Sequence, residues 1–342
     1  MTFLKNAWYA AGWEEDLSGD PIARTFLNEP VVLFRDSTGA AVALADRCPH
    51  RFAPLSLGKV EGDAIRCPYH GLVFDKGGAC VRNPHGKGAR PSSLSVRTYP
   101  LLTQNGMIWI WMGDKELAGG SRPPAYDFLT DNEHKTLHGS LHVRANYELV
   151  TDNLLDLSHA EFLHPFIMPE GVASTIKYSC LVEGDTIGAI HEMPDQDNTP
   201  LFRLLMPDVR RIDGRANNFW RAPANMYLDV GMRELDSGER RDCAIPQVHL
   251  LTPETEFSTH YFWAAARLLA KDDQRVDDAI LAGFSNAFEN EDEPMIRAVQ
   301  ERMGGVNLFE LDPALLPMDE ASVRARRELA RLIRNEQESA AG

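Results

Sequence analysis

Residues 48–71 read CPHRFAPLSLGKVEGDAIRCPYHG and contain two cysteines and two histidines in alternating order. Cys48 and His50 are separated by one residue, and Cys67 and His70 are separated by two. The 342-residue chain holds only five cysteines, so this is an unusual use of a scarce residue. The 16 residues between His50 and Cys67 are enough for a hairpin that brings both loops together. The segment therefore predicts a metal site built from two loops.

Two thiolates and two imidazoles suit either a tetrahedral zinc ion or a [2Fe–2S] cluster with mixed ligands. Zinc fingers pair cysteine with cysteine and histidine with histidine, whereas each loop here supplies one of each. One iron can therefore bind Cys48 and Cys67 while the other binds His50 and His70, which is the Rieske arrangement. Because imidazole is neutral, the exchange raises the potential to about −150 to +300 mV, against about −400 mV for plant-type clusters. A structural zinc knuckle and a chance arrangement of buried side chains are the alternatives.

Composition and charge exclude several classes of protein. The net charge of −15 argues against nucleic acid or an anionic membrane surface as the main partner. No apolar run approaches the roughly 20 residues that span a bilayer, and the N-terminus lacks the core of a signal peptide. An odd number of cysteines in a long chain does not favour a disulfide framework. We expect a cytoplasmic protein.

The pattern along the chain predicts an α+β protein with two domains. The first 115 or so residues favour short strands separated by loops rich in Gly and Pro, and the linker GGSRPPAYD follows at 119–127. A helical stretch at about 146–164 precedes strand-like runs to about residue 266, and the rest is helical. We predict domains at residues 1–118 and 128–342.

A second metal motif lies at residues 153–164, NLLDLSHAEFLH. His159 and His164, with a carboxylate from elsewhere, would form the two-histidine, one-carboxylate triad of non-haem Fe(II) oxygenases. Residues five apart on a regular α-helix diverge by about 140°, so the helix must end, widen or carry a π-bulge between them. The alternative is a pair of histidines that pack within an ordinary helix.

The third ligand must come from downstream, and FENEDEPMIRAV at 288–299 supplies candidates. Asp292 continues an apolar stripe, and a carboxylate there is costly unless a cation or hydrogen bonds compensate it. The stripe consists of Leu281, Phe284, Phe288, Met295 and Val299. Glu289, Glu291 and Glu293 remain competing candidates.

Taken together, these motifs resemble the terminal oxygenase component of Rieske non-haem iron oxygenases, in the branch of vanillate O-demethylases and dicamba monooxygenase. The resemblance spans nearly the whole chain. It includes KNAWYAAGW, CPHRFAPLS, CPYHGLVFD, NPHGKGARP, IWIWMGD, ELVTDNLLDLSHAEFLH, LTPETE and EDEPMIRAVQER.

The resemblance implies a role for each residue of these motifs. Cys48, His50, Cys67 and His70 would be the cluster ligands, and His159, His164 and Asp292 would be the iron ligands. Asp156 matches the aspartate that links a cluster histidine of one subunit to an iron-site histidine of its neighbour. Asn153 matches a catalytic-site residue close to the iron that is not a firm ligand.

The resemblance also implies fold, partners and reaction. It implies an all-β Rieske domain followed by a helix-grip domain, a homotrimer, and electrons from NAD(P)H through a separate reductase or ferredoxin. With O₂, the oxygenase would hydroxylate or O-demethylate a small substituted aromatic acid. Alternatives are an aryl-methyl or N-methyl monooxygenase, a ring-dihydroxylating dioxygenase, a Rieske-type electron carrier without oxygenase activity, or a zinc-stabilised binding protein.

Residues that recognise the substrate are harder to find in the sequence. His249 lies on an expected strand and matches a polar pocket position in the related branch, although a core histidine is an equal alternative. Arginines could meet a carboxylate or sulfonate, but most arginines lie at protein surfaces. The candidates between residues 203 and 221 are Arg203, Arg210, Arg211 and Arg221.

Overall fold

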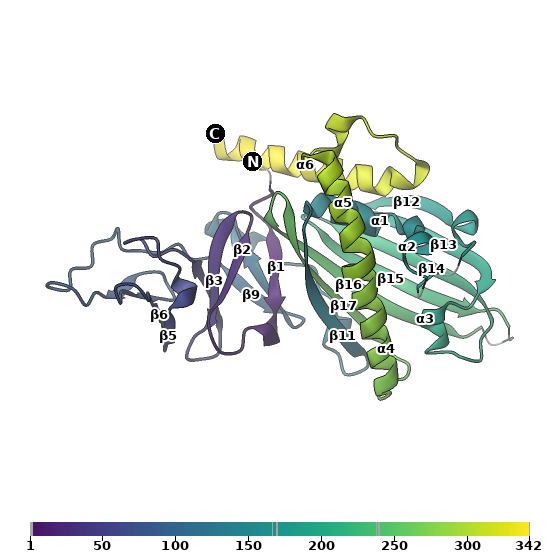
Figure 1. Cartoon of the computed structure of the whole chain (residues 1–342), viewed down its shortest axis with the longest axis horizontal. Coiled ribbons are helices and arrows are strands. Elements are labelled where there is room, and N and C mark those ends of the chain that lie inside the picture. The colour runs from purple at the N-terminus through teal and green to yellow at the C-terminus, as the bar shows by residue number, and fades with distance from the viewer. Residues whose placement is uncertain (1–2, 166, 169, 237, 239, 342) are drawn as a thin grey trace. The chain divides into compact units, whose positions relative to one another are not determined.

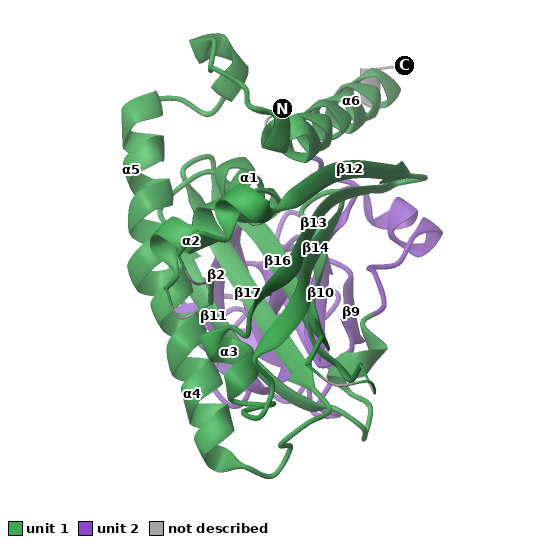
Figure 2. Cartoon of the chain, turned by 90° about the vertical axis from the view of Figure 1, so that its right-hand side faces the viewer, with its two compact units in different colours: residues 1–2, 126–342 green, residues 3–125 purple. Residues whose placement is uncertain are grey.

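The computed structural model describes residues 3–165, 167–168, 170–236, 238 and 240–341 (Figure 1). The chain forms two compact units, which meet in the sequence between Ala125 and Tyr126 (Figure 2). No helix within the described ranges is both long enough and apolar enough to cross a membrane.

The first unit consists of short antiparallel strands in three sheets across its described residues. One sheet has the order β1 (Trp8–Trp13), β10 (Met107–Trp111), β9 (Leu101–Gln104), and another β2 (Ile22–Phe26), β3 (Glu29–Arg35), β4 (Ala41–Ala45). The third has the order β5 (Lys59–Glu61), β6 (Ala64–Arg66), β7 (Val73–Asp75), β8 (Cys80–Arg82). Phe34, Leu44 and Phe74 pack in one core cluster that also contains Cys48 and Cys67. The predicted cluster loops therefore rest on a hydrophobic core.

The second unit is built on a seven-stranded antiparallel sheet. Its strand order is β11 (Lys135–Val143), β17 (Ser258–Arg267), β16 (Asp242–Thr255), β15 (Asn225–Glu234), β14 (Arg211–Arg221), β13 (Thr186–Asp197), β12 (Lys177–Glu183). The helices are α1 (Tyr147–Leu155), α2 (Ala160–Leu163), α3 (Pro200–Arg203), α4 (Gln274–Ser285), α5 (Glu293–Met303) and α6 (Glu320–Ala341). Figures 1 and 2 show α4 and α5 running along one face of this sheet. The predicted α+β class, a β domain followed by a sheet covered by helices, is confirmed.

Side-chain alternation determines which residues of the sheet face the helices. His249 on β16 pairs with Met226 on β15 and with Trp263 on β17, so these three side chains share a face. The Trp263 ring contacts Phe284 of α4, with ring centroids 5.6 Å apart. This face is therefore the inner wall of the unit.

The helical stretch predicted at about residues 146–164 is interrupted, as the spacing of His159 and His164 requires. Helix α1 ends at Leu155, a 3₁₀ turn follows at Leu157–His159, and α2 ends before His164. The Asp156 carboxylate accepts the backbone N–H of Ser158 at 3.0 Å, so it caps the new turn instead of continuing the helix.

The predicted apolar stripe is also only partly correct. Phe284, Phe288 and Asp292 are buried, but Met295 and Val299 are 49% and 41% exposed. The cause is a π-helical segment at Asn286–Asp292, whose wider turns advance the buried face by about one residue. Beyond it, in α5, the buried residues are Glu293, Ile296 and Gln300.

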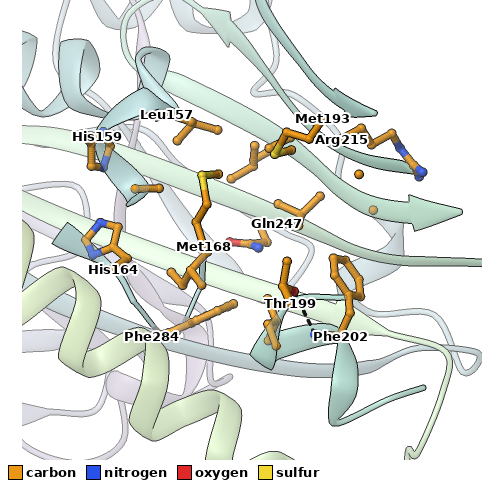
Figure 3. Close-up of a pocket in the computed structure, with 18 of the residues that line it drawn as sticks. Leu157, His159, His164, Met168, Met193, Thr199, Phe202, Arg215, Gln247 and Phe284 are labelled. Atoms are coloured by element: carbon orange, nitrogen blue, oxygen red, sulfur yellow. Dashed lines mark hydrogen bonds between the residues drawn. The ribbon is translucent and has the colours of Figure 1, made fainter. Parts of the chain in front are cut away.

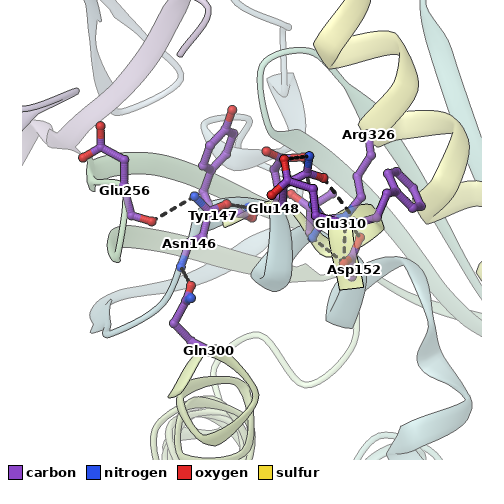
Figure 4. Close-up of polar contacts among 11 residues, drawn as sticks. Asn146, Tyr147, Glu148, Asp152, Glu256, Gln300, Glu310 and Arg326 are labelled. Atoms are coloured by element: carbon purple, nitrogen blue, oxygen red, sulfur yellow. Dashed lines mark hydrogen bonds and ion pairs between the residues drawn. The ribbon is translucent and has the colours of Figure 1, made fainter. Parts of the chain in front are cut away.

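An ion-pair network joins the C-terminal helix to α1 (Figure 4). Arg326 of α6, 6% exposed, donates to the Asp152 carboxylate at 2.6 Å and to Glu148 at 3.0 Å. Asp152 precedes Asn153, so the network holds α1 where its last turn approaches the predicted iron ligands.

We predict that Arg326→Leu lowers the free energy of unfolding by about 3 kcal/mol, because it leaves two mostly buried carboxylates without a cation. Urea denaturation followed by circular dichroism measures this loss. The matched control is Arg331→Leu on the same helix, since the Arg331 side chain is 52% exposed and pairs with Glu328 on the helix surface. That change should cost less than about 1 kcal/mol. Equal losses in the two variants would contradict the prediction.

Candidate active site and metal centres

The two loops of the first motif are the same turn used twice. The carbonyl of Cys48 accepts the N–H of Phe52 at 2.8 Å, and the carbonyl of Cys67 accepts the N–H of Gly71 at 3.2 Å. Both fourth residues have left-handed backbones, with φ of 59° at Phe52 and 71° at Gly71. Glycine tolerates this conformation, whereas Phe52 is strained in it.

These turns bring the four predicted cluster ligands together. Cys48 and Cys67 are 1% and 2% exposed, and the rings of His50 and His70 lie with their centroids 4.5 Å apart. Strands β5 and β6, which pair antiparallel, form the predicted hairpin between the loops. Two buried sulfurs and two adjacent imidazoles could hold a mixed-ligand cluster.

The chemistry of this donor set fits a cationic iron cluster. Burial, together with the neighbouring Cys67, raises the pKa of the Cys48 thiol to about 11. Bound iron cations would compensate the negative charge of two thiolates placed side by side in this interior. The loop at 83–88 adds His85, whose Nε2 lies 2.7 Å from the carbonyl oxygen of His70. The sequence analysis had not singled out His85.

In the second unit, breaks in helical structure bring together the predicted iron ligands. His159 ends the 3₁₀ turn, and His164 caps the C-terminal end of α2 with φ −123° and ψ 70°. The two rings therefore converge, with centroids 5.2 Å apart. The difficulty of two histidines five residues apart is resolved because α2, the short helix between them, ends at Leu163, and the backbone of His164 leaves the helical conformation.

Asp292 completes the group from the end of the π-helical segment. Its Oδ1 lies 3.1 Å from Nε2 of His164 and 3.5 Å from Nε2 of His159. One ligand atom from each of the three residues lies within 4.8 Å of the others. Two imidazoles and one carboxylate in this proximity fit the triad of non-haem iron oxygenases.

Neighbouring groups orient both histidines. Nδ1 of His164 donates to Oε2 of Glu291 at 2.7 Å, and Nδ1 of His159 donates to the backbone carbonyl of Asp156. Both Nε2 atoms are thereby left for a metal. Burial works to lower the pKa of His164, but its hydrogen bonds with Asp292 and Glu291 raise it overall. A bound cation would take the place of the proton that these carboxylates attract.

The structure also separates Asp292 from its acidic neighbours. Glu291 contacts the far nitrogen of His164, Glu293 lies 3.5 Å from Nε of Arg144, and Glu289 is exposed. Of these four acidic residues, Asp292 alone joins the two histidines in the ligand group.

Asn153 and Asp156 lie beside the triad. Nδ2 of Asn153 donates to Oδ1 of Asp292 at 3.0 Å, so it orients this carboxylate. The Asp156 carboxylate accepts the Ser158 hydroxyl at 2.6 Å, and Asp156 lines a surface depression together with His159.

A cavity of about 90 Å³ extends from the iron ligands between the helices and the sheet (Figure 3). His159, His164 and Asp292 line one end of it. Most of the remaining wall is apolar and includes Leu157, Met168, Met193, Phe202, Leu228 and Phe284.

His249 lines this cavity, so it is more than a histidine packed in the core. It is 1% exposed, its Nδ1 lies 2.6 Å from the hydroxyl of Tyr261, and its Nε2 has no hydrogen-bond partner within the described part of the chain. Burial lowers the pKa of His249 to about 3, so the imidazole is neutral at physiological pH.

The four arginines considered for substrate binding do not line the cavity. Arg211 pairs with Asp195 and Asp197, and Arg221 pairs with Asp185, at the surface. The sequence analysis missed Gln247, which lines the cavity two residues before His249. Strand alternation from His249 was the signal that could have found it.

Two family models match the chain. The vanillate O-demethylase oxygenase C-terminal domain matches residues 143–335, and the Rieske [2Fe–2S] domain matches residues 7–100. The second match contains both cluster loops, and the first contains the three-residue iron site.

Relatives match over nearly the full length. The oxygenase component of dicamba O-demethylase from Stenotrophomonas maltophilia is 37% identical, over 97% of this chain and 98% of that protein. A putative toluene-4-sulfonate monooxygenase iron–sulfur subunit from Comamonas testosteroni is 39% identical, over 89% of this chain and 90% of that protein.

A solved structure matches equally well. The crystal structure of dicamba monooxygenase bound to dicamba superposes with a TM-score of 0.91 at 37% identity and covers 100% of both chains. The chain therefore belongs to the Rieske non-haem iron oxygenases of the vanillate O-demethylase family, as the oxygenase component of a monooxygenase with a Rieske cluster and a mononuclear iron held by His159, His164 and Asp292.

Proposed function

We propose that this oxygenase removes the methyl group from a methoxy substituent of a single-ring aromatic acid. The observation that carries the proposal is an apolar cavity of about 90 Å³ that opens onto the iron ligands. An apolar cavity of about 150 Å³ holds benzene, so this smaller cavity must widen even for one ring, which disfavours larger substrates. Met168 and Met193 line the cavity, and their flexible side chains can move to admit the ring.

The reaction balances as follows. The methoxy arene, O₂, two electrons and two protons give a phenol, formaldehyde and water. One oxygen atom enters a methyl C–H bond and the other leaves as water. The resulting hemiacetal then breaks its C–O bond. When bound, the iron supplies O₂ activation and the Rieske cluster supplies electrons one at a time.

Each part of the chain has a defined task in this proposal. Cys48, His50, Cys67 and His70 hold the cluster. Glu291 keeps the proton on Nδ1 of His164, so that Nε2 stays a metal ligand. The apolar wall excludes water, and the neutral imidazole of His249 donates a hydrogen bond to the acid group.

The proposed partners follow from the oxygenase role. A separate reductase draws electrons from NAD(P)H and delivers them directly or through a ferredoxin. Three copies of the chain form a ring, in which Asp156 connects a cluster of one subunit to the iron site of the next. Residues 1–118 and 128–342 are the proposed functional domains.

A panel of single-ring acids with a surrogate reductase tests the proposed reaction. We expect at least one methoxybenzoic acid to give phenol, formaldehyde and O₂ consumption in a 1:1:1 ratio. Matched acids without the methoxy group should give no formaldehyde. O₂ uptake without formaldehyde across all methoxy acids would contradict the proposal.

Hydroxylation of an aryl methyl group is the second candidate. The 39% identity to a putative toluene-4-sulfonate monooxygenase subunit favours it. The same panel separates the two, because a methyl-substituted acid or sulfonate would then give a benzyl alcohol and no formaldehyde. N-demethylation would require an amine substrate, and ring dihydroxylation would yield a diol.

We predict that Asp156→Asn slows turnover by roughly tenfold or more, about 1.4 kcal/mol in the barrier, while both metal centres stay loaded. Asparagine can still accept the hydrogen bonds from Ser158, so the turn should keep its fold. Stopped-flow absorbance should show that the reductase reduces the cluster at the normal rate, whereas reoxidation with substrate and O₂ is slow. Wild-type reoxidation at full iron content would remove the bridging role.

We also predict that Glu291→Gln weakens Fe(II) binding by about 10- to 100-fold, because the hydrogen bond that orients His164 loses its negative charge. Anaerobic Fe(II) titration of apoprotein measures the change. Glu289→Gln is the matched control, since Glu289 is exposed three residues before Asp292 on the same segment. If both variants bind iron as tightly as the wild type, Glu291 does not support the metal site.

A further inference from the structure

The cavity wall contains an arginine whose side chain points away from the cavity. On β14, Gly214 and Ala216 are buried on the inner face, and Arg215 alternates to the outer face. Its Nε donates to Asp229 at 2.7 Å. Its guanidinium packs directly against Gly231, in space that any larger side chain at that position would occupy. Figure 3 shows this guanidinium directed away from the iron ligands. Among the described residues that line the cavity, no cationic side chain is therefore available to an acid.

An unpaired amide lies in the cavity instead. Gln247 is 5% exposed, and its side-chain amide has no hydrogen-bond partner among the residues that the structure describes. It pairs with Leu228 on one side and with the small Ala265 on the other. Neither neighbour can satisfy the amide, and Figure 3 shows it pointing toward Met168 on the side of the iron ligands. A buried amide without a partner is costly unless a ligand completes it.

Gln247 and His249 form a pair of neutral donors. They are two residues apart on β16, so their side chains share the inner face at a separation of about 7 Å along the strand. The Tyr261 hydroxyl is the partner of Nδ1 of His249. If the Tyr261 hydroxyl donates to Nδ1, the imidazole carries its hydrogen on Nε2. This hydrogen is then the one unpaired donor of the Tyr261–His249 pair, and it lies in the cavity wall. The opposite tautomer would leave both the hydroxyl hydrogen and Nε2 unsatisfied.

From these contacts, we propose that Gln247 is a specificity-determining residue that binds the acid group of the substrate. Its NH₂ and the Nε2–H of His249 donate to the carboxylate oxygens. Recognition of the anion therefore uses two neutral hydrogen-bond donors and no ion pair. This inference rests on the proposed demethylation of an aromatic acid, because it names the group that places the methoxy end at the iron.

The test compares two variants of Gln247, beside one control variant each at Gln274 and Gln196, with two ligands. The ligands are a methoxybenzoic acid that the wild type demethylates and the methyl ester of the same acid. The variants are Gln247→Glu, which replaces the donor with a negative charge of the same size, and Gln247→Met, which removes the donor without adding charge. Calorimetric titration of anaerobic holoenzyme measures affinity, and formaldehyde release measures turnover. Thermal melting verifies that each variant is folded.

We expect Gln247→Glu to weaken binding of the acid at least tenfold and to change binding of the ester less than threefold. Gln247→Met should weaken binding of the acid by a smaller factor. The control Gln274→Glu makes the same chemical change on the exposed start of α4 and should alter neither affinity.

Two outcomes would overturn the inference. One is equal acid affinity in wild type and both Gln247 variants. The other is loss of acid affinity in Gln196→Glu but not in Gln247→Glu, because Gln196 lines the same cavity from β13, three strands away from β16. Failure of the proposed function gives a different result, since wild-type enzyme would then demethylate no aromatic acid at all.

Discussion

The iron site depends on a single buried carboxylate, that of Asp292. A negative charge in the interior is costly unless hydrogen bonds and cations surround it. Here the surrounding groups are Asn153 at 3.0 Å and the Nε2 atoms of His164 and His159 at 3.1 Å and 3.5 Å. These groups come from one short segment, so α1 and α2 must stay close to the helix that carries Asp292. A metal cation completes the compensation.

The ligands of both centres occur where regular structure is interrupted. The cluster loops close through left-handed residues at Phe52 and Gly71. The iron ligands follow a 3₁₀ turn, the end of α2 and a π-helical segment. A regular α-helix separates residues five apart by about 140°, so it cannot aim two of them at one ion. Less favourable backbone geometry at these positions allows the side chains to converge, which is common at functional sites.

The wall of the cavity combines apolar bulk with a few neutral polar groups. Burial keeps His249 neutral, since the pKa of its imidazole falls to about 3. Arg215 is paired with Asp229 on the other side of the sheet. A neutral wall costs less to bury than a charged one, and it can still orient a substrate through hydrogen bonds. The shape and polarity of this wall therefore limit which substrates can reach the iron ligands.

The sequence by itself determined the chemistry of both metal sites. Cys48, His50, Cys67 and His70 stand at short, fixed spacings, and so do His159 and His164, because residues close in sequence must lie close in space. The α+β class also followed from local patterns. Tertiary structure decided what depends on contacts between distant segments. The choice of Asp292 over its glutamate neighbours depends on a π-helical segment that no local pattern specifies. The exposure of Met295 and Val299 has the same cause. The orientation of Gln247 and Arg215 on opposite faces of the sheet depends on strand register, which packing and hydrogen bonding across strands impose.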